Sequence, residues 1–196
     1  MVLLNEEKII SIIREDAWMM DILQAAKTLD LPDWWICAGF VRAKIWDTLH
    51  GFHKRTQVPD VDVIYFDSSN LDESEEKWYE IKLESLLPNI PWSVKNEARM
   101  HIRNNTAPYT SSIDAISKFP ETATAIGIKL DGRGNLILAA PYGITDVVNM
   151  VVKPTPFVLM DKGRIQNYET RVAQKDWKGT WGKLQILQVN NISPVQ

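Results

Sequence analysis

The chain has 196 residues, of which 45% are hydrophobic, with a net charge of −3 at pH 7 and a single cysteine. This length suffices for one domain with a substantial core, or for one domain with an appendage. The charge gives no overall attraction to nucleic acid, no apolar run reaches the ~20 residues of a membrane-spanning helix, and one cysteine excludes an internal disulfide framework. No signal peptide is recognisable, so we expect a cytoplasmic protein without a membrane partner.

The first fifty residues are predicted to form two helices on either side of a buried strand. Apolar residues recur at near-helical spacing over 5–29, which predicts one amphipathic helix ended by a proline. Residues 34–38 are apolar and predict a buried strand, in which Cys37 is expected to be an unreactive thiol. Apolar residues four apart predict a further helix over 40–50.

The middle of the chain continues this alternation. A polar loop over 51–60 leads into a strand over 61–66. Residues 71–87 are predicted to be helical, because acidic residues crowd the first turns, where the helix dipole favours them. A short strand over 92–95 then runs into a helix that begins near Asn96.

The last part combines short elements. A short helix is expected to end near Lys118, and strands over 123–130 and 135–139 are expected to flank a glycine-rich turn. A final helical region begins near Ile144 and is interrupted by prolines before it resumes near Phe157.

Interleaved strands and helices place the fold in the α/β or α+β class, as a short mixed β-sheet with flanking helices. We expect residues 1–150 to form the core, including the N-terminal helix, and residues 151–196 to form a mostly helical C-terminal extension packed on it. The eight tryptophans are expected to fill the core and interfaces.

Two aspartates stand at the start of the strand over 61–66. Asp60 and Asp62 are two residues apart, so in an extended strand both side chains project from one face. Adjacent carboxylates repel each other unless a cation lies between them, and oxygen ligands suit Mg²⁺ or Mn²⁺. The alternatives are a solvated strand face and a turn cap.

A glycine and an arginine precede this strand by about twenty residues. Gly39 follows an apolar run, and Arg42 comes three residues later at the start of a predicted helix. A backbone turn approaching a phosphate at a helix N-terminus needs such residues, although Arg42 could also be a surface residue. Lys95 and Arg99 lie near a second predicted helix start and are also phosphate partners by type. The alternative there is a charged helix with a salt bridge.

Several blocks of the chain, in this order, resemble a family of bacterial nucleotidyltransferase-like proteins in the DNA polymerase β nucleotidyltransferase superfamily. They are residues 38–51, 59–67, 94–101, 107–116, 121–128 and 141–148. The resemblance implies a polymerase β-like core with a short mixed sheet. It also implies that Gly39 corresponds to the phosphate-contacting glycine and that Asp60 and Asp62 correspond to the metal-binding carboxylates.

The chain departs from that superfamily at two positions. Phe40 follows Gly39 where Gly-Ser or Gly-Gly is usual. Ser93 stands on the strand where the superfamily uses a third carboxylate, and Glu97, the next acid, begins a helix.

The sequence therefore predicts a nucleotidyltransferase that depends on Mg²⁺ or Mn²⁺. It would move a nucleoside monophosphate from a nucleoside triphosphate to an acceptor that the sequence does not identify, and release pyrophosphate. The expected catalytic residues are Asp60, Asp62, Lys95 and Arg99, and the expected nucleotide-binding residues are Gly39, Phe40 and Arg42. One alternative is a non-catalytic nucleotide- or anion-binding protein on the same fold. Another is an RNA-modifying module, for which basic residues over 162–183 are a modest signal that a solvated helix face also explains.

Overall fold

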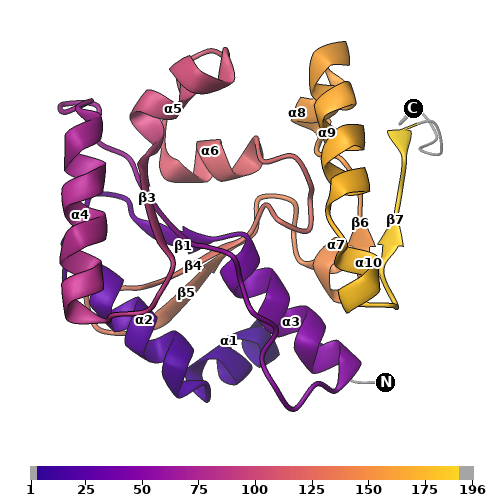
Figure 1. Cartoon of the computed structure of the whole chain (residues 1–196), viewed down its shortest axis with the longest axis horizontal. Helices are drawn as coiled ribbons and strands as arrows, with labels where there is room; N and C mark the ends of the chain where they lie inside the picture. Colours follow the sequence, from indigo (N-terminus) through magenta and orange to yellow (C-terminus); the bar gives the residue numbers. More distant parts are fainter. Residues whose placement is uncertain (1–3, 190–196) are drawn as a thin grey trace.

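A mixed five-stranded sheet organises the computed structural model, which describes residues 4–189 (Figure 1). The strand order is β3-β2-β1-β4-β5, with β2 and β3 parallel and the other neighbours antiparallel. The strands are β1 (Trp35–Cys37), β2 (Val61–Tyr65), β3 (Trp92–Asn96), β4 (Gly127–Leu130) and β5 (Leu136–Ala139). The predicted short mixed sheet with flanking helices is confirmed.

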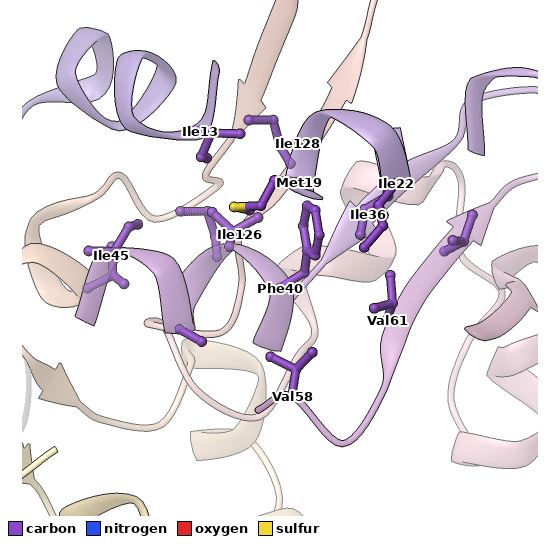
Figure 2. Close-up of a cluster of buried hydrophobic side chains, with 14 of the residues drawn as sticks. Ile13, Met19, Ile22, Ile36, Phe40, Ile45, Val58, Val61, Ile126 and Ile128 are labelled. Carbon is purple, nitrogen blue, oxygen red and sulfur yellow. The ribbon is translucent and has the colours of Figure 1, made fainter. Parts of the chain in front are cut away.

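Helices cover both faces of this sheet. The helices that precede β4 are α1 (Glu6–Arg14), α2 (Ala17–Lys27), α3 (Gly39–His50), α4 (Glu73–Leu86), α5 (Glu97–Asn104) and α6 (Ser112–Ser117). One face of the sheet packs its alternate residues, such as Ile36 and Val61, against α1 to α4 in the main core (Figure 2). The opposite face carries Cys37 and Ile64 and packs against α6 in a smaller cluster. Cys37 is fully buried, as expected.

The expected single helix over 5–29 is wrong, because the chain bends between α1 and α2. Asp16 lies at the bend, where its side chain accepts a hydrogen bond from the Met19 amide and caps α2. The same carboxylate accepts a hydrogen bond at 2.8 Å from Lys44 on α3. A capping aspartate that is also paired across the fold therefore outweighs the apolar periodicity that runs through this segment.

The C-terminal part, described over residues 145–189, combines four helices with two short strands. Its elements are α7 (Thr145–Val148), β6 (Val151–Val152), α8 (Pro156–Leu159), α9 (Lys162–Gln174), α10 (Trp177–Thr180) and β7 (Gln185–Ile186). The parallel pairing of β6 with β7 was not predicted, since two-residue strands have no periodicity to detect. Residues 190–196 of the expected extension lie outside the described residues. The strand expected over 123–130 is limited to β4, and residues 123–126 are buried but lie outside the strand.

Two neighbouring residues of α3 join this C-terminal part to the sheet. The Trp46 ring packs edge-to-face against Trp181 with centroids 5.1 Å apart, and its indole N–H donates to the Val147 carbonyl. Asp47, 5% exposed, accepts hydrogen bonds from the Thr56 amide (2.8 Å), the Thr56 hydroxyl (2.7 Å) and the Trp181 indole (2.8 Å). One buried carboxylate thus fixes the loop before β2 and the segment after α10.

No helix among residues 4–189 is both long enough and apolar enough to cross a membrane.

We predict that Asp47→Ala lowers the free energy of unfolding by about 3 kcal/mol, because three donors lose a charged acceptor in a buried place. Urea unfolding followed by tryptophan fluorescence measures the loss. Asp146→Ala is the control, since it removes a carboxylate whose ion pair with Lys153 is partly exposed, and it should cost about 1 kcal/mol or less. Equal losses in the two variants would contradict the role of Asp47.

Candidate functional site

Four of the residues singled out from the sequence lie around one cavity of about 300 Å³, which we call the aspartate cavity. They are Gly39, Arg42, Asp60 and Asp62. The sheet and α3 form one side of this cavity, and residues of α9 and α10, among them Arg171, Lys175 and Trp177, form the other. Sequence-distant segments therefore meet here, as the positions of α3, α9 and α10 in Figure 1 indicate.

The turn between β1 and α3 places the start of α3 beside the aspartates. Cys37 at the end of β1 pairs with Asp62 in the antiparallel register of β1 and β2. The next residue, Ala38, has φ +52° and ψ −112°, an unfavourable conformation for a residue with a side chain. The chain then enters α3 at Gly39, so the first turn of the helix lies at the cavity wall.

The ionisation of Asp62 depends on its burial and on the neighbouring Asp60. Burial and, to a lesser extent, the neighbouring Asp60 raise the pKa of the half-buried Asp62 carboxyl to about 6, although a hydrogen bond from Ser93 acts in the opposite direction. Ser93 is the register partner of Asp62 on β3, so its side chain lies on the same face of the sheet. A pair of carboxylates that resist simultaneous ionisation is stabilised by a cation.

The donor set fits a divalent ion held jointly by protein and substrate. Mg²⁺ in such sites is usually bound by one or two carboxylates together with phosphate oxygens and water. Asp60 and Asp62 supply two carboxylates. Within residues 4–189 no group of three or more histidine, cysteine, aspartate or glutamate side chains forms a metal site of protein ligands alone.

Arg42 is a buried cation without a carboxylate partner among the described residues. It is 7% exposed, and its guanidinium carbon lies 4.9 Å from the Trp46 ring centroid and 4.7 Å from that of Trp177. Burial lowers its pKa to about 10, so it remains charged at neutral pH. Its Nε has no hydrogen-bond partner within the described part of the chain. A buried unpaired donor of this kind at a cavity wall is suited to an anion.

Phe40 does not present its side chain to the cavity. The ring is 2% exposed and packs in the main core 5.8 Å from Trp18, among Met19 and Ile36 (Figure 2). Its backbone amide belongs to the first turn of α3. The bulk that distinguishes this residue from the usual serine or glycine therefore fills the core and does not crowd the turn.

Lys95 and Arg99 do not line the aspartate cavity. Glu76 on α4 is fully buried. Its carboxylate accepts hydrogen bonds from Arg99 Nε at 3.1 Å and Nη2 at 2.8 Å, and it also pairs with Lys95 at 3.3 Å. Glu76 also accepts from the Asn96 amide. The ion-paired arrangement that the sequence allowed as an alternative is therefore the one that the structure adopts, and it joins α4, β3 and α5.

Three residues at or near the site were not among the predicted site residues. Arg171 on α9 and Lys175 directly after this helix line the side of the cavity opposite the two aspartates. The basic composition of 162–183 signalled them, but it did not indicate which of its cations face inward. Glu97 is 6% exposed, and burial, then Asp62 and Glu76, raise its pKa to about 7. The sequence analysis noted Glu97 as the next acid after Ser93 but did not place it in the site, because an acid at a helix start is ordinary capping chemistry.

Comparisons with known proteins give a family match and similar solved structures. Residues 24–186 match a family model described as nucleotidyltransferase. A solution NMR structure described as revealing a CCA-adding enzyme head domain is 38% identical, with a TM-score of 0.85 over 94% of this chain and 97% of that one. No curated protein sequence matches the chain significantly.

Two larger enzymes share the fold at low identity. A CCA-adding enzyme in complex with ATP has a TM-score of 0.54 and 14% identity, over 92% of this chain and 43% of that one. The Thermotoga maritima CCA-adding enzyme in complex with tRNA has a TM-score of 0.53 and 15% identity, over 94% and 42%. This chain therefore spans less than half of those enzymes, and the similarity shows the fold.

We predict that Asp62→Asn stabilises the protein without nucleotide or metal. Because the folded pKa of about 6 lies above the reference value of 3.8, Asp62 contributes stability at low pH that is lost as the pH rises through about 6. The variant should melt about 2 to 4 °C above wild type at pH 7.5, as roughly 1 kcal/mol produces in a domain of this size, and show no gain at pH 4.

The control for this comparison is Asp21→Asn, which changes an exposed aspartate on α2. Melting temperatures of the three proteins across pH 4 to 8 provide the measurement. A gain that does not depend on pH would contradict the proposed origin in the burial of Asp62.

Proposed function

The chain belongs to the nucleotidyltransferase family, and we propose that it transfers a nucleoside monophosphate from a nucleoside triphosphate to an acceptor, with release of pyrophosphate. The observation that carries the proposal is the aspartate cavity, in which two adjacent carboxylates face a buried arginine without a carboxylate partner. Carboxylates hold a cation, and the arginine holds an anion. A nucleoside triphosphate with its divalent ion satisfies both.

Asp60 and Asp62 would hold Mg²⁺ or Mn²⁺ in this site. When bound, the ion neutralises charge on the triphosphate and stabilises the attacking and leaving oxygens. Protein donors neutralise the remaining charge of the triphosphate. Arg42 and the amides of the first turn of α3 are available on one side, and Arg171 and Lys175 on the other.

In the proposed reaction an acceptor hydroxyl oxygen forms a bond to the α-phosphorus. The bond from that phosphorus to the bridging oxygen breaks, and pyrophosphate leaves with the electron pair. The proton of the hydroxyl goes to the Glu97 carboxylate, whose raised pKa of about 7 makes it a better base than an ordinary glutamate. Lys95 lowers the pKa values of both Asp62 and Glu97, so we assign it an electrostatic role.

Arg99 acts indirectly in this proposal. Its guanidinium pairs with Glu76, which also accepts from the Asn96 amide. Asn96 is the residue before Glu97, so this network fixes the point at which β3 becomes α5. Arg99 is therefore a positioning residue for Glu97.

We predict that Asp62→Asn lowers Mg²⁺-dependent pyrophosphate release by about 100-fold or more, since it removes one of two carboxylates that hold the ion. The measurement is a coupled pyrophosphate assay with each of the four ribonucleoside triphosphates, with Asp21→Asn as the control. Full activity in Asp62→Asn would exclude the proposed metal role.

The non-catalytic alternative has its own signature in the same experiment. A nucleoside triphosphate that raises the melting temperature with Mg²⁺, but yields no pyrophosphate under any condition, would favour a binding protein on this fold.

We predict that Ser93→Asp raises Mg²⁺-dependent turnover about tenfold, because it places a third acid beside Asp62 on the cavity face of the sheet. The same change should lower stability without metal, since three carboxylates then repel one another. Turnover and melting temperature are measured together. The control is Ser74→Asp, on the exposed first turn of α4.

Slower turnover in Ser93→Asp would show that no acid is needed on β3. Glu97→Gln then becomes the decisive variant. It should reduce the maximal rate and remove the rise in rate near pH 7 that the titration of Glu97 would produce.

A further inference from the structure

A second cavity of about 420 Å³ lies beside the aspartate cavity, and we call it the α5–α9 cavity. Residues of α5, α6 and the segment between them line one side, and residues of α8 and α9 line the other. These two groups of helices stand opposite each other in Figure 1. The volume is within the range of about 300–1,000 Å³ typical of small-molecule sites.

Positive charges predominate around this cavity. Its lining carries one acid, Glu97, and four cations, which are Arg103, Lys118, Arg164 and Arg171. Lys118 and Arg171 have carboxylate partners in Asp114 and Glu121. Neither Arg103 nor Arg164 has an ion-pair partner among residues 4–189. In a protein of net charge −3, two such arginines at one cavity form a local anion site.

Arg164 is held in place before any ligand binds. Its guanidinium carbon lies 3.8 Å from the ring centroid of Phe157, and Nη1 donates to the Phe157 carbonyl at 3.2 Å. An arginine fixed in this way loses little side-chain freedom when it binds an anion. The lining near it also includes Asn167, whose side-chain amide suits a polar ring or sugar next to the anion.

The two cavities meet at groups that take part in the proposed reaction. Arg171 lines both of them. Glu97 lines the α5–α9 cavity, and Asp62, which lines the aspartate cavity, lies close enough to raise the pKa of the Glu97 carboxyl. A molecule in the α5–α9 cavity therefore has one end at the arginines and the other at the proposed proton acceptor.

From this arrangement we infer that the α5–α9 cavity binds the acceptor, and that the acceptor is a small phosphorylated sugar or nucleotide. The identification of the ligand as an acceptor rests on the proposed function, whereas the binding site is inferred from its own geometry. The acceptor phosphate contacts Arg164 and Arg103, and its free hydroxyl points to Glu97. A small ligand fits better than a polynucleotide, because the two unpaired arginines border a single cavity and do not form a longer basic track.

The test uses ribose 5-phosphate as the probe, with ribose and inorganic phosphate for comparison. Binding is followed by amide shifts in ¹H–¹⁵N NMR spectra of the full chain. We expect ribose 5-phosphate to shift amides around Arg164 and Asn167 and to bind more tightly than inorganic phosphate. Ribose should produce no shifts.

Substitutions separate the two cavities. Arg164→Gln should weaken binding of ribose 5-phosphate about tenfold, the effect of one lost charged hydrogen bond, and leave the affinity for ATP with Mg²⁺ unchanged. Lys162→Gln is the matched control, since it removes a charge from the exposed start of α9 outside the cavity lining. Arg42→Gln should weaken binding of ATP with Mg²⁺ and leave the affinity for ribose 5-phosphate unchanged. Arg103→Gln, at an exposed position, repeats the test if Arg164→Gln fails to fold.

Three results would overturn the inference. They are the absence of shifts at the cavity, an equal loss in Lys162→Gln, and binding of an eight-nucleotide RNA about 100-fold tighter than ribose 5-phosphate with a steep salt dependence. The proposed function fails separately. If ribose 5-phosphate binds the cavity as described but no nucleoside triphosphate yields pyrophosphate, the binding site is supported and the proposed transfer reaction is excluded.

Discussion

The burial of Arg42 between tryptophans is the interaction on which the site depends. A guanidinium in a buried place loses hydration, and contacts with aromatic faces compensate for part of that loss. Trp46 comes from the same helix, whereas Trp177 and Trp181 come from the C-terminal part. The cation therefore has its environment only when that part is packed on α3. The carboxylate of Asp47, one turn along the helix, strengthens the same junction through the Trp181 indole.

A separation of charge follows from this packing. The carboxylates of Asp60 and Asp62 lie on the sheet side of the aspartate cavity, and the cations of Arg171 and Lys175 lie opposite them, on α9 and at its C-terminal end. Arg171 is itself oriented by Glu121, which is fully buried and accepts from Arg171 Nε at 2.7 Å. Opposite charges thus face each other across a space and do not form direct pairs. An arrangement of this kind is completed by a ligand that carries phosphate and a divalent cation.

The ion-pair network around Glu76 differs from the aspartate cavity, because its charges already have partners within the protein. Glu76 accepts several hydrogen bonds from Arg99 and Asn96 and pairs with Lys95, so it holds α4, β3 and α5 together and has little capacity left for a ligand. The contrast between Arg42 and Arg99 shows why residue type alone does not identify a site. Both are arginines near helix starts, but only the former has a buried donor without a partner.

Local patterns in the sequence determined the five strands of the main sheet, most of the helices, the fold class, and the proximity of Asp60 to Asp62. Such features depend on spacings of two to four residues, which the sequence displays directly. The break at Asp16, the β6–β7 pair, and the inward position of Arg171 and Lys175 were decided by the tertiary structure alone. Each depends on contacts between residues far apart in the chain, such as Asp16 with Lys44 and Asp47 with Trp181. Whether Arg99 binds Glu76 or a substrate, and whether Phe40 fills the core or the turn, was likewise settled by packing, because a side chain's partners are set by the whole fold and not by its neighbours in sequence.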